Sequence, residues 1–208
     1  MAQLFNNKYR IPSARLQNWN YANEAMYFVT ICTNNRENYF GKIITNGSDG
    51  SDVETQCIAS LQPTEIGKIA HSEWYKSVEM RNDMNLELGE FVVMPNHIHG
   101  IIVIGANEYN TNTDARRDAM HRVSTPNDTN AMHRVSTNQF APQSKNLASI
   151  IRGYKSAVTT YARKNGIEFD WQPRFHDHII RSMDDYHRIS NYIVNNPAKW
   201  QEDKFYQL

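Results

Sequence analysis

The stretch Phe91-Val-Val-Met-Pro-Asn-His97-Ile98-His99-Gly100-Ile-Ile-Val-Ile104 places two histidines two residues apart in a run of strand-forming residues. Side chains alternate across a strand, so His97 and His99 are expected to project from the same face. The preceding residues 94–96 contain Pro and Asn, which predict a turn that leads into this strand. Two neighbouring imidazoles on rigid backbone are unfavourable in an apolar core, but they are well placed to bind a divalent metal ion together.

Length and composition predict one compact domain with a sizeable loop or tail. The chain has 208 residues, with 22 Lys plus Arg and 22 Asp plus Glu, and its formal net charge is zero. A local basic face would still allow nucleic-acid binding. Cys32 and Cys57 are far apart and suggest no disulfide framework, which fits a reducing cytosol. We expect no membrane association, because no apolar run approaches the length of a span.

The order of elements predicts the fold class. Hydrophobic periodicity and capping residues predict a strand at 26–33, a helix at 64–78, strands at 84–95 and 97–104, a helix at 146–164, a strand at 175–181 and a last helix at 184–196. This is the order of an α+β, ferredoxin-like split β-α-β sandwich with an antiparallel sheet and an extra C-terminal helix. Pro197 is expected to end that helix, because proline disfavours helical backbone at the residue before it.

The chain is expected to form an N-terminal arm, residues 1–24, and a single domain, residues 25–208. Residues 106–143 break the pattern, since they are rich in Asn, Thr, Asp, Arg and Ser. They contain Ala-Met-His-Arg-Val-Ser-Thr twice, at 119–125 and 131–137. Two polar copies are too few for a solenoid, so we expect a flexible surface insertion that grew by duplication.

The last predicted helix carries a second group of candidate site residues. Two imidazoles bind a metal ion weakly, so the histidine pair needs a third ligand. Tyr192 and Asn196 are four residues apart and share one helical face. A tyrosine hydroxyl, with an ordinary pKa near 10, is a poor nucleophile, but a nearby divalent cation would favour its phenolate. The Asn196 carboxamide oxygen could complete the ligand set; taken alone, Tyr192 would more simply be a core aromatic.

In combination, these motifs resemble the single-tyrosine transposases of the HUH (His-hydrophobic-His) endonuclease superfamily, the IS200-like transposases, and in particular the REP-associated tyrosine transposases of bacteria. The likeness covers nearly the whole chain in the right order, apart from the insertion. It is carried by residues 27–33, Asn35-Arg36, Phe40, 93–102, 147–155, Trp171-Gln172, Phe175, 177–181 and 192–200.

The resemblance implies a metal-dependent enzyme that cuts and rejoins single-stranded DNA at hairpin-associated sites through a 5′-phosphotyrosine intermediate. It assigns the nucleophile to Tyr192 and the metal ligands to His97, His99 and Asn196, with Asn195 as the alternative third ligand. Mg²⁺ prefers oxygen ligands and imidazoles suit Mn²⁺, so we expect one of these two ions as the cofactor. The expected setting is the bacterial cytoplasm and nucleoid, with the protein acting as a monomer or a homodimer.

Basic residues outside these motifs could line a track for DNA phosphates, with Tyr154 or Trp171 stacking on unpaired bases. These residues are Arg152, Lys155, Arg174, Arg181 and Arg188. A solvated helix face together with core aromatic residues would give the same pattern. Arg10 and Arg15 of the arm could grip the stem of a DNA hairpin.

Two other functions remain open from the sequence. The chain could be a non-catalytic DNA hairpin-binding protein derived from a transposase. It could also be a metal phosphoesterase that uses four histidines, because His176 and His178 form a second His-x-His pair.

Overall fold

The computed structural model describes residues 4–5, 8–9, 16, 19–45, 59–111 and 144–206. Arg10, Arg15, Cys57 and the two repeats of the predicted insertion lie outside the described residues. The strands are β1 (Leu4–Phe5), β2 (Lys8–Tyr9), β3 (Ala25–Cys32), β4 (Gly41–Thr45), β5 (Ala59–Pro63), β6 (Leu86–Val93), β7 (His97–Ile104) and β8 (His176–Ile180). The helices are α1 (Glu65–Glu79), α2 (Glu108–Thr111), α4 (Leu147–Lys164) and α5 (Met183–Asn195), with short 3-10 helices η1 (Asn34–Arg36), η2 (Asn82–Met84) and η4 (Pro197–Glu202).

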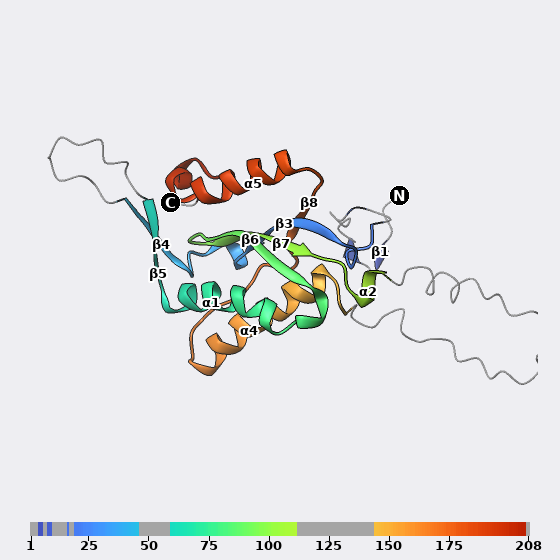
Figure 1. Cartoon of the computed structure of the whole chain (residues 1–208). Helices are drawn as coiled ribbons and strands as arrows, with labels where there is room; N and C mark the ends of the chain where they lie inside the picture. The colour runs from blue at the N-terminus through green and yellow to red at the C-terminus, as the bar shows by residue number, and fades with distance from the viewer. Residues whose placement is uncertain are drawn as a thin grey trace, which may run out of the picture.

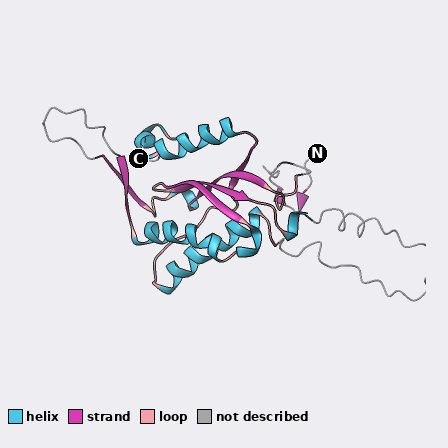
Figure 2. Cartoon of the chain, in the orientation of Figure 1, coloured by secondary structure: helices cyan, strands magenta, loops and turns pink. Residues whose placement is uncertain are grey.

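A four-stranded antiparallel sheet forms the middle layer, with the strand order β6-β7-β3-β8. Helices α1 and α4 cover one face of this sheet, and α5 lies across the other (Figures 1 and 2). The predicted fold is confirmed, because this order and these crossovers are those of a ferredoxin-like sandwich. Each of its helices and strands lies within two residues of the range expected from the sequence.

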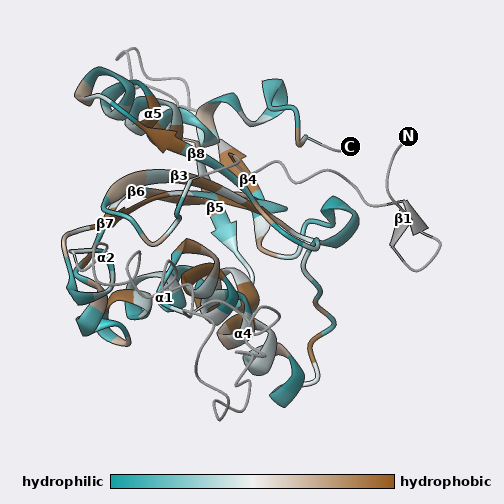
Figure 3. Ribbon diagram, turned by 90° about the vertical axis from the view of Figure 1, so that its right-hand side faces the viewer, coloured by the Kyte–Doolittle hydropathy of each residue, from teal (hydrophilic) through white to brown (hydrophobic). Residues whose placement is uncertain are grey.

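Strand β7 supplies both faces of the sheet with buried side chains. Ile98, Ile102 and Ile104 belong to the core under α1 and α4. Ile101 points the other way and packs with Ile180, Ile189 and Ile193 beneath α5. Most residues of β7 are therefore apolar, as expected for a strand that is covered on both sides. Figure 3 shows that the strands of this sheet are largely hydrophobic.

Gly100 allows a helix residue to pack directly on the sheet. A Cβ atom at this position would lie 2.4 Å from Cζ2 of Trp74, which is closer than real Cβ atoms approach. The Trp74 ring instead lies flat against Phe91, with centroids 4.5 Å apart and planes inclined by 9°. This contact joins α1 to β6 across β7.

Side-chain caps fix the starts of the three long helices. Thr64 accepts a hydrogen bond from the backbone N–H of Gly67, Asn146 forms a capping box with Ser149, and Ser182 accepts from Asp185. The end of α5 differs from expectation. Asn196 keeps right-handed helical backbone (φ −59°, ψ −42°) in front of Pro197, and the chain continues directly into η4. The proline changes the type of helix, and so the C-terminal segment turns back towards the sheet.

The hairpin of β4 and β5 was not predicted from the sequence. Its two strands pair in register from Gly41 with Pro63 to Thr45 with Ala59. Each strand has only five residues, too short for a clear alternation of polar and apolar positions. Among the described helices, none is both long enough and apolar enough to cross a membrane.

Candidate metal and tyrosine site

Strand β7 and helix α5 bring the predicted site residues together. Ile189 and Ile193, four residues apart, hold α5 on the sheet. Tyr192 lies on the flank of the same helix, and its Oη atom is 3.2 Å from Nε2 of His99. The Tyr192 side chain is 42% exposed, so the hydroxyl group lies where buried protein meets solvent.

The His97 ring is oriented by the residue before it. Asn96 donates both protons of its side-chain amide, to the carbonyl oxygens of Arg36 (3.1 Å) and Phe205 (2.8 Å). Its Oδ1 atom therefore faces Nδ1 of His97, at 2.9 Å. This acceptor requires a proton on Nδ1 and leaves the lone pair of His97 Nε2 directed into the site, as in the outer shell of metal-binding histidines.

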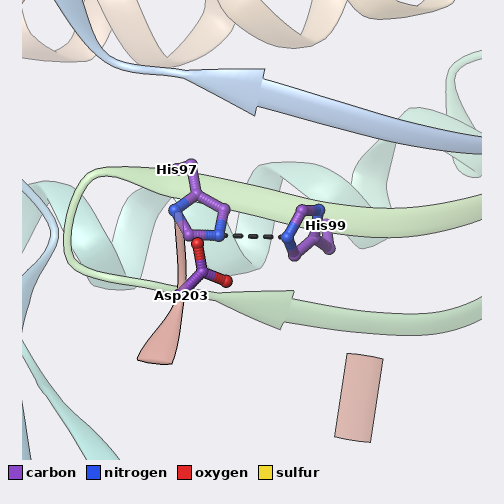
Figure 4. Close-up of side chains that lie close together, drawn as sticks. All are labelled: His97, His99 and Asp203. Carbon is purple, nitrogen blue, oxygen red and sulfur yellow. Dashed lines mark hydrogen bonds between the residues drawn. The ribbon is translucent and has the colours of Figure 1, made fainter. Parts of the chain in front are cut away.

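His99 is oriented from the neighbouring strand. Oγ1 of Thr30, its partner across the β3–β7 pair, lies 2.9 Å from His99 Nδ1. A hydroxyl can donate or accept, so this bond positions the ring in either tautomer. The Nε2 atoms of His97 and His99 are 3.1 Å apart (Figure 4). This is close to the separation expected for adjacent ligands, each about 2.1 Å from one shared ion.

Burial keeps both imidazoles neutral near pH 7. It lowers the pKa of His97 to about 3, with help from the positive charges of Lys204 and Arg36. Burial also lowers the pKa of His99 well below its ordinary value, and the neighbouring His97 acts in the same direction. Neutral rings are the form that binds metal ions.

Asp203 is a candidate ligand that the sequence analysis missed. One ligand atom from each of His97, His99 and Asp203 lies within 4.8 Å of the others, and Figure 4 shows the Asp203 carboxylate beside the two rings. Asp203 follows η4, and its Oδ1 atom accepts a hydrogen bond from the backbone N–H of Phe205 (2.7 Å). No spacing rule identifies it, since its position depends on the unexpected continuation of the helix past Pro197.

Asn196 adjoins this cluster. Its Nδ2 atom donates to Oδ2 of Asp203 at 2.9 Å, while its Oδ1 atom is buried without a hydrogen-bond partner among the described residues. An unpaired buried acceptor costs about 1–3 kcal/mol, which a cation would offset. The two imidazole nitrogens and the carboxylate oxygen, which lie within 4.8 Å of one another, form a donor set that suits Mn²⁺ and related divalent ions. The residues present therefore fit a metal ion.

The site disfavours ionisation of Tyr192 while no cation is bound. Burial and the negative charge of Asp203 raise the pKa of Tyr192 to about 12, although a hydrogen bond with Asn196 acts against them. A positive charge next to the carboxylate would counter the second of these effects.

Comparison with known proteins gives one relative that decides the family. No family model matches the chain. The chain is 33% identical over 198 residues to a protein of Haemophilus influenzae described as uncharacterized, with 93% of this chain and 92% of that protein covered. The chain belongs to the same family as this Haemophilus influenzae protein.

Two solved structures are also similar to this member of the family. One is a REP-associated tyrosine transposase bound to a REP hairpin, with a TM-score of 0.47 and 18% identity, covering 92% of this chain and 77% of that chain. The other is from Deinococcus radiodurans and is described as a candidate transposase, with a TM-score of 0.32 and 14% identity, covering 88% and 97%.

The five basic residues predicted to contact DNA are not gathered on one face of this family member. Arg188 lines a cavity together with Tyr192 and His99. Arg152 and Lys155 lie on α4, across the sheet from α5. Arg174 precedes β8 and Arg181 follows it. A single track through all five is therefore not formed around Tyr192.

Lys155 and the two aromatic residues expected to stack on bases have structural contacts. The Lys155 ammonium donates to the backbone oxygens of Gln172 and Arg174, at 2.7 Å each, and burial lowers its pKa to about 8. Tyr154 is 1% exposed and donates to Ala70 O, and Trp171 is 7% exposed. The stacking prediction for Tyr154 and Trp171 is wrong, because their rings lie in the core.

The remaining candidates lie outside the cluster. His178 faces Asp185 on α5, with Nε2 and Oδ2 3.2 Å apart. In the part of the chain that the structure describes, neither His176 nor His178 belongs to the group of possible metal ligands. Asn195 is exposed and donates to Asn191 O within its own helix.

Proposed function

We propose that this protein is a metal-dependent transposase of the REP-associated tyrosine type, which nicks single-stranded DNA at hairpin-associated sites and transfers the strand. The observation that carries this proposal is the position of the Tyr192 hydroxyl, 3.2 Å from Nε2 of His99. A potential nucleophile thereby adjoins a group of residues that can bind a cation.

His97, His99 and Asp203 would hold the divalent ion, Mn²⁺ or Mg²⁺, with the carboxamide oxygen of Asn196 as a fourth donor. When bound, such an ion would offset the charge of the scissile phosphate and favour the phenolate form of Tyr192. Asn96 and Thr30 would orient the two imidazoles through hydrogen bonds to the Nδ1 atoms, which would not bind the ion.

Tyr192 would carry out the nucleophilic step. Its Oη atom forms a bond to phosphorus while the bond between phosphorus and the 3′-oxygen breaks, and the departing 3′-oxygen takes up a proton. The phenolic proton leaves to solvent, to which Tyr192 is open. The 5′-phosphotyrosine retains the energy of the broken bond, so the 3′-hydroxyl of another strand can displace Tyr192 and complete the transfer.

The test uses labelled single-stranded hairpins that carry the palindrome flanking the gene, incubated with Mn²⁺. Wild type is expected to form a protein–DNA adduct that survives denaturation, and Tyr192→Phe is expected to form none. Tyr186→Phe is the matched control, because Tyr186 lies on the same helix and the histidine whose ring it contacts is His187, which is not one of the proposed metal ligands. An adduct of normal yield with Tyr192→Phe would overturn the assignment.

A further inference from the structure

A groove extends from Tyr192 across the sheet to its β8 edge. A cavity of about 740 Å³ reaches Tyr192 and His99 at one end. A second cavity, of about 330 Å³, reaches Arg36 and His176. The two share Phe28, Thr30, His178 and Lys204 in their linings. We call this continuous depression the β3–β8 groove.

The pairing of strands sets the direction of the groove. Thr30 pairs with His99 on one side and with His176 on the other, so these three residues form one row across the sheet. Phe28 and His178 are paired in the next row. Paired residues project from the same face, and the row therefore spans about 10 Å from His99 to the edge strand.

Charge is unevenly distributed along the groove. Glu202, Asp203 and Arg188 line the cavity that holds Tyr192, and the Arg188 charge is paired with that of Asp185. Lys204 lines both cavities, and Arg36 lines the second. Asp177 also borders the second cavity, but its side chain alternates to the opposite face of the sheet. One end of the groove thus suits a cation, and the other suits a phosphate.

An aromatic ring forms the floor between these ends. Phe28 lines both cavities. Its ring centroid is 5.3 Å from that of His99 and 6.2 Å from that of Tyr192, which it meets edge-on. An aromatic face beside a basic track is the usual platform for an unpaired nucleobase, because every base has a face that can stack.

We infer that the β3–β8 groove binds the nucleotide next to the scissile phosphate of a single-stranded DNA, with its base on Phe28 and its outer phosphate at Lys204 and Arg36. This inference rests on the proposed function, because it takes the Tyr192 end as the point of cleavage. It assigns Phe28 and Lys204 to substrate binding, together with the row of residues between His99 and β8.

The contribution of Lys204 is tested by binding of a short fluorescent single-stranded oligonucleotide in EDTA, where no metal-dependent cleavage occurs. Lys204→Gln is expected to weaken binding about fivefold at low salt and to lower the slope of log affinity against log salt by about one. Lys68→Gln is the matched control, since Lys68 is exposed on α1, across the sheet from the groove. An unchanged slope in Lys204→Gln would overturn the assignment of the phosphate.

The stacking platform is tested with oligonucleotides that carry 2-aminopurine at each position in turn. One position is expected to be quenched on binding to wild type, and Phe28→Leu should lose that quenching and bind roughly tenfold more weakly. Phe28→Trp should retain it, which separates stacking from a general packing defect in Phe28→Leu. Tyr75→Leu, at an aromatic residue 50% exposed on α1, should behave like wild type. Normal quenching in Phe28→Leu would overturn the inference.

The binding and adduct experiments can reject the proposed nucleotide-binding groove and the proposed covalent mechanism independently of each other. Adduct formation by wild type, together with wild-type binding by Lys204→Gln and Phe28→Leu, would overturn the groove and leave the proposed function in place. Weakened binding by both variants, with no adduct from wild type in any metal, would support the groove and overturn the covalent mechanism.

Discussion

The two faces of the sheet are built from the same strands, but the face under α5 combines an apolar cluster with buried polar groups. Under α1 and α4, strand β7 contributes Ile98 and Ile102 to an apolar core. Under α5, it contributes His97 and His99, which are equally buried but polar. The first face is stabilised by burial of apolar area. The second retains neutral imidazoles and a carboxamide oxygen that has no hydrogen-bond partner among the described residues, and a bound ligand would satisfy these groups.

The largest effect on stability should come from the apolar face. Trp74→Ala removes a fully buried ring that packs on Phe91, and should lower the free energy of unfolding by about 3–5 kcal/mol. Urea denaturation measures this loss. Tyr75→Ala, at the exposed neighbour, should change it by less than about 1 kcal/mol. Equal losses of unfolding free energy in Trp74→Ala and Tyr75→Ala would contradict the expected difference between a core residue and a surface residue.

On the α5 face, metal affinity should change more than stability. His99→Gln keeps polar groups and a similar volume, so the free energy of unfolding should fall by less than about 1.5 kcal/mol. Its affinity for Mn²⁺ should fall by more than about 100-fold, since even the loss of an outer partner costs 10–100-fold. The electron paramagnetic resonance signal of free Mn²⁺ measures the affinity. Wild-type affinity in His99→Gln would show that the ion binds elsewhere.

Asp203→Asn should have an intermediate effect. It removes the charge of the proposed carboxylate ligand, yet its side-chain oxygen can still accept the hydrogen bond from Phe205. We expect Mn²⁺ affinity to fall roughly 10–100-fold, with the melting temperature nearly unchanged. Glu202→Gln neutralises the adjacent residue and should retain affinity. The opposite ranking of these two variants would contradict the role given to Asp203.

Thr30→Val should give the smallest change. It removes the hydroxyl that positions Nδ1 of His99 while keeping a β-branched side chain in β3. Mn²⁺ affinity is expected to fall by at most about 10-fold, in the same resonance assay. A loss as great as that of His99→Gln would mean that Thr30 does more than orient the ring.

The sequence predicted the parts of the protein that depend on local pattern. Alternation along β7 identified the shared face of His97 and His99, and hydrophobic periodicity with capping residues placed α1, α4 and α5 within two residues of their observed ranges. The approach of Tyr192 followed from the order of elements and from the family resemblance. The contact itself, at 3.2 Å, required the structure.

The features that escaped prediction depend on contacts distant in sequence. Asp203 reaches the histidines because Asn196 stays helical before Pro197, which a rule for the preceding residue alone does not foresee. The sequence allowed Tyr154 and Trp171 to lie either in the core or against DNA bases, because aromatic residues occur both in cores and on stacking platforms. Only their burial distinguishes these roles.

The most direct measurement of the central claim is the mass of the peptide linked to DNA. Trypsin releases Ile189–Lys199, which contains Tyr192 as its single tyrosine. After incubation with a single-stranded hairpin and Mn²⁺, followed by nuclease digestion, this peptide should carry the mass of a 5′-phosphorylated nucleotide. A nucleotide attached to another peptide, such as the one with Tyr186, or no attachment in any divalent metal, would contradict the account.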